Sequence, residues 1–243
     1  MPCGRRHTEC VRPAVPGYSP AVLEAELARR RAQNLVARRT DPRSVTPSIR
    51  GFAQAIDRQR AAVERVPLLN ASRPDLVAVC AALDEAEVAA LALTIDDPAA
   101  ELPRFAEAAR AVGVPVLRAD LLLEEFQILE SRVAGADAVL LVASALPGPL
   151  LERLAGAARS THMAAVVACA DRAEIDRAVA AGAAAVALYS PELCGAVPRR
   201  VLAVALPLGA QTPDAAPLRG RADALLDPGL DSASAFRRLL EES

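Results

Sequence analysis

Lysine is the most informative absence from this sequence. The 243-residue chain contains none, so its positive charge comes from arginine, apart from two histidines. Any reaction that needs a lysine Schiff base, or lysine as a general acid or base, is therefore excluded. Tryptophan is also absent, and aromatic residues make up 2% of a chain that is 53% hydrophobic. The core must therefore be built mainly from alanine, valine and leucine.

Other absences limit the setting in which the protein works. Its cysteines (Cys3, Cys10, Cys80, Cys169 and Cys194) are odd in number and scattered, which fits a reducing cytoplasm better than a disulfide framework. No uncharged apolar stretch reaches the ~18 residues of a membrane span. The arginine-rich N-terminus lacks the apolar run of a secretory signal. A net charge of −2 indicates no nucleic-acid or membrane-surface partner. We expect a cytoplasmic protein.

The N-terminal sixty residues differ in pattern from the rest. Residues 1–18 are rich in proline, glycine and arginine and predict a flexible arm. Within it, Cys3, His7 and Cys10 have no clear fourth ligand, so we expect no metal site there. Ser19 followed by Pro20 is typical of a helix start and predicts a helix to about residue 39. A proline-containing loop and a short helix over 51–59 complete an extension that we assign to residues 19–60.

From residue 66 onward, short apolar runs without polar alternation recur, which is typical of strands buried on both faces of a parallel sheet. Their spacing of roughly 20–25 residues suits one strand–helix unit. The runs are 66–69, 88–93, 114–117, 138–142, 164–168, 184–188, 201–204 and 222–226. Helical patterns lie near 75–85, 102–111, 124–134, 149–159, 172–181, 212–219 and 232–241. We predict a (β/α)8 TIM barrel forming one domain over residues 19–243, with an open doubly wound sheet as the alternative.

Two details refine this expectation. Residues 189–200 are too few for an ordinary crossover helix, so we expect a reduced helix after the sixth strand. The run Gly-Ala-Asp-Ala-Val-Leu-Leu at 135–141 is echoed by Arg-Ala-Asp-Ala-Leu-Leu at 221–226. Such echoes are expected of repeated strand–helix units.

With these runs in order, most of the chain resembles the indole-3-glycerol phosphate synthase family, whose members are (β/α)8 lyases of tryptophan synthesis. The similarity is best at Val114-Pro-Val-Leu-Arg-Ala-Asp120, where that family typically has Leu-Arg-Lys-Asp. Further matching segments are 50–56, 126–128, 135–141, 174–182 and 212–214. The resemblance also implies a helical extension before the barrel.

The residues to which the resemblance assigns chemistry are mostly replaced. The family's catalytic lysine after the third strand corresponds to Ala119, and the glutamate of the fifth strand to Ala168. The asparagine pair after the sixth strand corresponds to Tyr189 and Ser190. The remaining departures are the first strand end at 68–75, which has no glutamate or lysine, and the strand-seven and strand-eight phosphate motifs, which become Leu206-Pro207-Leu208-Gly209 and Pro228-Gly229-Leu230. Arg118, Asp120 and Gly209 are the main residues retained.

These replacements predict that the family's reaction is lost. Ring closure with decarboxylation and dehydration needs a cationic acid and a carboxylate, and each such group contributes about 10²–10⁴ in rate. Because the replacements are mostly small or apolar, we predict a pocket for an apolar ligand without phosphate. An alanine- and leucine-rich chain would also fill vacated positions this way. The predicted substrate-binding residues are Asn70, Ala119, Ala168, Tyr189, Ser190, Pro207 and Leu208, with Tyr189 as the candidate catalytic residue and no metal or cofactor.

Other residues have simpler interpretations. Arg118 and Asp120 are expected to hold the barrel rim together. Ser72 is a further candidate at the mouth beside Asn70. Cys169 follows a buried strand, and neither histidine is placed to serve as its base, so packing is the favoured interpretation.

Three functions remain open from the sequence. The first is a repurposed enzyme that acts by conformational restraint, such as a cyclase in natural-product biosynthesis, because holding reactive ends together lowers a barrier without proton transfer. The second is a non-catalytic ligand-binding or regulatory subunit, as a homo-oligomer or with a partner enzyme docked near 189–200. The third is an ordinary synthase, which the absence of lysine opposes.

Overall fold

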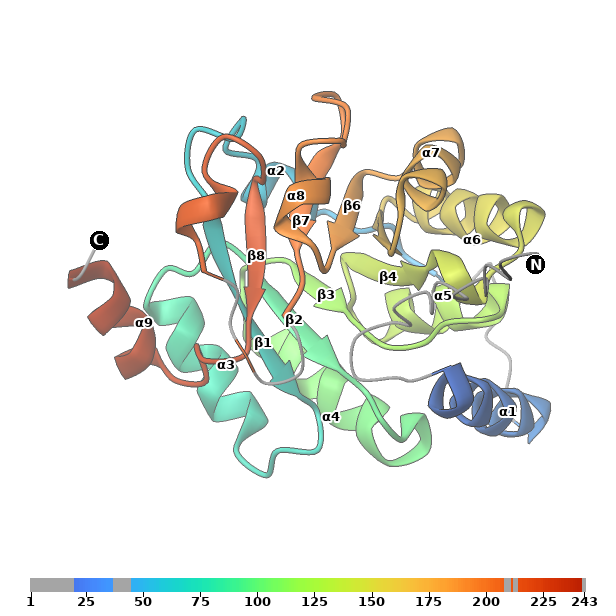
Figure 1. Cartoon of the computed structure of the whole chain (residues 1–243). Helices are drawn as coiled ribbons and strands as arrows, with labels where there is room; N and C mark the ends of the chain where they lie inside the picture. Colours follow the sequence, from blue (N-terminus) through green and yellow to red (C-terminus); the bar gives the residue numbers. More distant parts are fainter. Residues whose placement is uncertain (1–19, 37–44, 208–210, 212–213, 242–243) are drawn as a thin grey trace, which may run out of the picture.

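A closed barrel of parallel strands, in sequence order, forms the centre of the computed structural model, which describes residues 20–36, 45–207, 211 and 214–241 (Figure 1). The strands are β1 Glu64–Asn70, β2 Leu91–Thr94, β3 Val116–Arg118, β4 Ala138–Val142, β5 Ala164–Cys169, β6 Ala185–Leu188, β7 Leu202–Ala205 and β8 Ala224–Asp227. The barrel closes where β8 pairs with β1, from Glu64 opposite Ala224 to Pro67 opposite Asp227. The predicted (β/α)8 fold is confirmed, and the open sheet is excluded.

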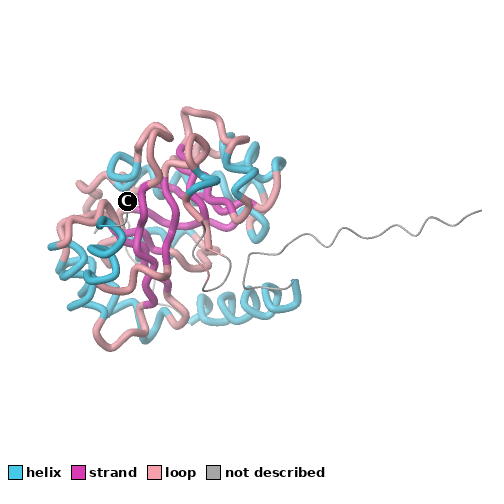
Figure 2. The backbone as a smooth tube through the Cα atoms, turned by 60° about the vertical axis from the view of Figure 1, so that its left-hand side comes forward, coloured by secondary structure: helices cyan, strands magenta, loops and turns pink. Residues whose placement is uncertain are grey.

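The helices surround this barrel, as Figure 2 shows in a second view. They are α1 Pro20–Val36, α2 Phe52–Ile56, α3 Leu76–Glu85, α4 Pro98–Ala111, α5 Glu125–Val133, α6 Gly148–Ser160, α7 Arg172–Ala180, α8 Pro191–Cys194 and α9 Ala233–Glu241, with short 3-10 turns η2 Ala143–Ala145 and η3 Ala216–Leu218. The predicted arm, including Cys3, His7 and Cys10, lies outside the described residues. None of the described helices is long and apolar enough to cross a membrane.

Two helix boundaries differ from the prediction for local reasons. Helix α4 begins at Pro98 rather than near residue 102, because the Asp97 carboxylate accepts a hydrogen bond from the Ala99 amide and Pro98 occupies the first turn. Helix α2 ends at Ile56 because Asp57 adopts an extended conformation, φ −70° and ψ 111°, and the positive φ of Gln59 and Arg60 keeps the predicted helix from continuing to residue 59.

The crossover helices on the β6–β8 side are reduced. Helix α8 has four residues, as predicted for this position. The predicted helix over 212–219 is wrong, since among its described residues only the 3-10 turn η3 forms. Pro217 lies inside that segment, and proline removes the amide that an α-helix needs. Little cover is needed on this side, because the outward-facing side chains of β7 are the small Ala203 and Ala205. Both are buried.

Two apolar cores result from the alternation of side chains along the strands. The larger one lies between strands and helices. The smaller one fills the barrel, and we call it the inner cluster; it contains Leu117, Leu140, Val166, Ala187 and Leu226, among others. Phe52 and Ile56 of α2 also belong to the inner cluster. Since α2 is joined to the end of the barrel where the strands begin, these two side chains close its base.

The sequence echo noticed at 135–141 and 221–226 has a structural counterpart. Asp137 precedes β4, and its Oδ2 accepts a hydrogen bond from the Val116 amide of β3 at 3.0 Å. Asp223 precedes β8, and its Oδ2 accepts one from the Ala203 amide of β7 at 2.9 Å. Both aspartates are buried, so the same device fixes two strand pairs on opposite sides of the barrel base.

Candidate functional site

The mouth of the barrel, where the strands end, is the expected location of a site in this fold. Apolar side chains line it from within. Five of them are partly exposed and pack against the inner cluster: Leu68, Ala119, Leu121, Ala145 and Tyr189. Beneath them Val142, Ala168 and Leu206 are buried. The mouth therefore has an apolar floor made by residues from several different strands.

Three of the residues predicted from sequence meet on this floor. Ala119 follows β3, Ala168 lies in β5, and Tyr189 follows β6. All three pack in the inner cluster, and Ala168 is 2% exposed whereas Ala119 and Tyr189 are partly open. The structure therefore brings these three side chains together inside the mouth of the barrel.

The predicted polar residues lie at the rim and are engaged with neighbours. Asn70 ends β1; its Nδ2 donates to Asp96 Oδ2 at 2.8 Å, and its Oδ1 accepts from the Ser72 amide at 2.7 Å. Ser190 precedes α8, and its hydroxyl donates to the Glu192 carboxylate, which holds the pKa of Glu192 below its usual value. Pro207 follows β7 and is partly exposed. Leu208, the last predicted residue, lies outside the described part of the chain.

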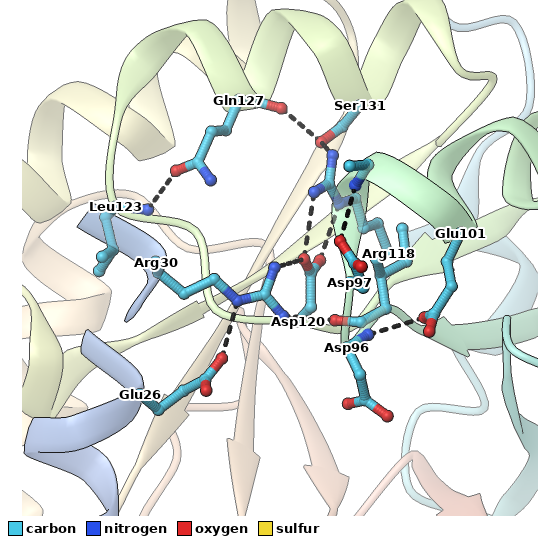
Figure 3. Close-up of polar contacts among 12 residues, drawn as sticks. Glu26, Arg30, Asp96, Asp97, Glu101, Arg118, Asp120, Leu123, Gln127 and Ser131 are labelled. Atoms are coloured by element: carbon cyan, nitrogen blue, oxygen red, sulfur yellow. Dashed lines mark hydrogen bonds and ion pairs between the residues drawn. The ribbon is translucent and has the colours of Figure 1, made fainter. Parts of the chain in front are cut away.

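Arg118 faces away from the mouth, into a buried polar network between β3 and α5 (Figure 3). Its Nε and Nη2 donate to Asp120 at 2.7 and 3.1 Å, and its Nη1 donates to Ser131 Oγ at 3.1 Å. Burial disfavours the charged form, yet Asp120 and Glu130 outweigh this and raise the pKa of Arg118. Its guanidinium therefore holds the rim together and does not reach the mouth.

Helix α1 is attached to this network from outside the barrel. Arg30, which is 2% exposed, donates to Asp120 Oδ2 at 3.3 Å, to the Ile95 carbonyl at 2.5 Å and to Glu26 at 2.8 Å (Figure 3). Arg29 adds a 2.8 Å bond to the Asp96 carbonyl. Helix α1 is therefore hydrogen-bonded to the loops after β2 and β3, at the edge of the mouth.

The rim is strongly acidic. The described loops that follow the strands carry eight carboxylates and one arginine. The carboxylates are Asp75, Asp96, Asp97, Asp120, Glu124, Asp171, Asp214 and Asp231, and the arginine is Arg73. Several of them cap helices or form ion pairs, but their summed charge still opposes a multiply charged anion at the mouth.

The loop after β8, which corresponds to a phosphate loop of the resembled family, is also occupied by a carboxylate. Asp227 is 2% exposed, and its Oδ1 accepts a hydrogen bond from the Gly229 amide at 2.8 Å. Its Oδ2 pairs with Arg65 at 2.9 Å. The Gly229 amide of this loop is therefore already bonded to a negative group and is not available to a phosphate.

The remaining reactive groups are poorly suited to chemistry. Cys169 is 1% exposed, and burial raises its pKa well above the usual range. Burial also raises the pKa of Cys80 to about 12 and of Cys194 to about 11. In the described residues no group of three or more potential ligands is arranged to hold a metal ion.

Sequence reasoning missed part of the floor. Leu68, Leu121 and Ala145 line the mouth as fully as the predicted residues do. Leu68 was detectable, because it lies two residues before Asn70 on the same face of β1. Leu121 and Ala145 lie in loops, where alternation gives no guide.

Comparison with known proteins identifies the lineage. The sequence model of indole-3-glycerol phosphate synthase matches residues 73–193. The indole-3-glycerol phosphate synthase of Chlorobium phaeovibrioides is 30% identical over 190 residues, covering 72% of this chain and 74% of that protein. The indole-3-glycerol phosphate synthase 2 of Streptomyces coelicolor is 34% identical over 173 residues, covering 67% of each.

Similarity among solved structures extends to the fold alone. The orotidine 5′-phosphate decarboxylase of Pyrococcus horikoshii superposes with a TM-score of 0.56 at 12% identity, over 73% of this chain and 98% of that one. The sequence relatives are closer, and they span most of the barrel. The chain therefore belongs to the indole-3-glycerol phosphate synthase family.

Proposed function

We propose that this member of the family no longer performs the ring closure for which the family is named, and that its mouth binds an apolar small molecule without a phosphate. One observation carries the proposal. Ala119 and Ala168, at the positions of the family's lysine and glutamate, pack in one apolar cluster inside the barrel. No other lysine in the chain can substitute, because there is none.

The electrostatics of the mouth support the same conclusion. A phosphorylated substrate would meet the acidic rim and, after β8, the buried carboxylate of Asp227. The Gly229 amide and Nη1 of Arg65 already bind Asp227, which neutralises part of the positive charge that a phosphate would need there. An uncharged ligand avoids this repulsion and gains from burial on the apolar floor.

Ring closure by restraint is the reaction class that suits these residues best. An apolar floor can hold a flexible molecule in a reactive shape, so that its internal rotations are frozen before the ring closes and the barrier falls without proton transfer. Tyr189 is the one phenol on the floor and is the candidate to hydrogen-bond a carbonyl of the ligand. A cyclase of this kind requires no lysine and no phosphate site.

The lost activity is tested by incubating the purified chain with the family's ribulose phosphate substrate and following the indole product by fluorescence. We expect no turnover above the uncatalysed rate, while the related Streptomyces coelicolor synthase run in parallel serves as the positive control. Turnover by this chain at a rate comparable with the control would refute the loss of activity.

Ligand binding is tested with the neutral fluorescent probe N-phenyl-1-naphthylamine, whose emission rises in apolar surroundings. We expect binding that Ala119→Arg weakens at least about tenfold, because the new side chain fills the floor with a charge. The exposed Ala99→Arg on α4 is the matched control and should bind like the parent. Equal binding by both variants would place the probe elsewhere and contradict the proposed site.

The tyrosine content allows a direct check of Tyr189. The chain has two tyrosines and no tryptophan, so a Tyr18→Phe variant leaves Tyr189 as the sole emitter. A ligand at the mouth should change its emission. If a ligand binds there and no product ever forms from candidate substrates, the non-catalytic binding subunit becomes the better description.

A further inference from the structure

A second cleft, of about 400 Å³, lies at the base of the barrel, at the opposite end from the mouth. The turn after α2, the loop before β7 and the starts of β7 and β8 form its walls. The lining residues are Asp57, Gln59, Arg60, Arg199, Leu202 and Asp223. The proposed function of the mouth uses none of them.

Arg60 is built into this cleft with its side chain 7% exposed. Its Nη2 donates to the carbonyl oxygens of Val197 at 3.0 Å and Val201 at 3.3 Å, and its Nε lies 3.7 Å from Asp223 Oδ2. The remaining nitrogen, Nη1, makes no hydrogen bond to any described residue, and it is not sealed from solvent. The guanidinium of Arg60 is thus fixed and almost buried, and its Nη1 remains available to donate a hydrogen bond in the cleft.

The acidic residues of the cleft are already engaged. Asp223 accepts hydrogen bonds from the amides of Arg60 at 3.0 Å and Ala203 at 2.9 Å. Asp57 Oδ1 accepts from the Gln59 amide at 2.8 Å. Arg199, by contrast, is exposed and forms no ion pair with a described residue. The cleft therefore offers a ligand the charged donors of Arg60 and Arg199, beside the exposed carboxylate of Asp57.

The backbone around Arg60 is held in an unfavourable shape. Gln59 and Arg60 are consecutive non-glycine residues with positive φ, an arrangement that costs free energy unless the surroundings enforce it. The Gly220 amide, which donates to the Arg60 carbonyl at 3.2 Å, is one such restraint. The loops on either side also carry three exposed arginines, Arg200, Arg219 and Arg221.

We propose that the base cleft is a binding site for an oxyanion, the carboxylate or phosphate group of a small molecule distinct from the ligand of the mouth. The cleft volume lies within the usual range for small-molecule sites. Nη1 of Arg60 supplies a pre-positioned, charge-assisted hydrogen bond, and Arg199 supplies a second from the outer edge of the cleft. The neighbouring arginines raise the local concentration of anions.

The test measures binding of inorganic phosphate and of citrate to the full chain by calorimetry at low ionic strength. We expect a Kd on the order of 1 mM for at least one probe, and weakening by about tenfold or more in Arg199→Gln, because one charged hydrogen bond is lost. Arg153→Gln, an exposed arginine on α6, is the matched control. Circular dichroism verifies that both variants fold.

The proposal fails if neither probe binds, or if Arg199→Gln and Arg153→Gln bind both probes as the parent does. Hexaglutamate provides a further arm. If this peptide binds in an Arg199-dependent manner while phosphate and citrate do not, the small-molecule proposal is overturned in favour of an acidic protein partner. Arg60→Gln is a second variant, and if it folds it should abolish binding of the probe.

Discussion

At the mouth of the barrel, the described parts of the loops after the strands carry eight carboxylates and one arginine, whereas the loops before the strands carry six arginines and four carboxylates. The interiors differ too. The mouth ends in the partly open apolar floor around Ala119 and Tyr189, while the base is closed by Phe52 and Ile56. Buried aspartates fix the base, with Asp137 accepting bonds from four separate groups.

This difference separates a structural end of the barrel from the end where a ligand would bind. Residues at the base of a TIM barrel serve stability, and residues at the mouth serve chemistry. The base keeps a repeated polar device at Asp137 and Asp223. At the mouth, the resemblance places Ala119 and Ala168 at the family's charged positions. The contrast therefore supports the proposed function, in which the scaffold is kept and the site differs.

The largest expected effect is at the base. Asp137→Ala removes a carboxylate that bonds the Val116 amide and the Ser48 hydroxyl and pairs with Arg50 and Arg132, leaving two arginines without their counter-charge. We expect a loss of about 3–5 kcal/mol in the free energy of unfolding, measured by urea denaturation.

The matched control for Asp137 is Asp171→Ala at the mouth, where the carboxylate caps α7 by accepting from the Glu174 amide. It should cost only about 1 kcal/mol. If the two variants were equally destabilised, the distinction between a polar, structural base and a replaceable mouth would be lost.

The attachment of α1 comes next in size. Arg30→Ala removes the bonds to Asp120 and the Ile95 carbonyl, which are buried. Amide exchange in α1 should accelerate roughly 10- to 100-fold, because hydrogen bonds to charged groups are worth about 1.5–3 kcal/mol. Arg31→Ala, exposed on the same helix, is the control and should leave exchange unchanged. Equal exchange in both variants would show that Arg30 does not hold the helix.

The same attachment should weaken in acid. Burial alone would raise the pKa of Glu26, but the hydrogen bonds from Arg29 and Arg30 outweigh it, and the pKa lies below its ordinary value of 4.5. A carboxyl whose pKa is lowered on folding stabilises the folded state above the ordinary pKa and loses that contribution as the pH falls through the folded value. The protection factors of the α1 amides, which correct for the pH dependence of intrinsic exchange, should therefore fall below about pH 4.5 in the parent and less so in Glu26→Gln.

The smallest effect is expected on the floor itself. Ala119→Lys restores the family's residue at a partly exposed position, so we expect a change within about 0.5 kcal/mol in stability. It should restore no synthase activity, because Ala168 and the occupied loop at Asp227 remain. Measurable turnover by this single variant would show that the rest of the site had survived.

Much of the fold could be predicted from the sequence, because buried strands leave unbroken apolar runs at a regular spacing. The errors are local. The start of α4 at Asp97 and Pro98 has the same pattern as Ser19 and Pro20, a capping residue followed by proline, so the sequence does contain this boundary. The prediction of a helix over 212–219 was wrong because it gave weight to the alanine and leucine residues and too little to the prolines, which an α-helix does not tolerate in its interior.

The site was only partly predictable. Ala119, Ala168 and Tyr189 could be placed at the mouth because the family resemblance assigned each of them to a strand end, where side chains on the inner face of the strand reach the mouth. Leu121 and Ala145 could not, since loop conformation depends on contacts with other elements. The base cleft at Arg60 left no motif at all, because its walls come from segments up to 166 positions apart in the numbering, from Asp57 to Asp223.

By itself, the sequence determined the barrel, the absence of lysine chemistry and the family resemblance, since apolar period and residue identity are local properties that need no coordinates. Only the tertiary structure decided that Arg118 faces the helices and that Asp227 accepts the hydrogen bond of the Gly229 amide. It also decided that Nη1 of Arg60 makes no hydrogen bond to a described residue. Hydrogen-bond partners are chosen among groups brought together by folding, and a linear pattern does not record those distances.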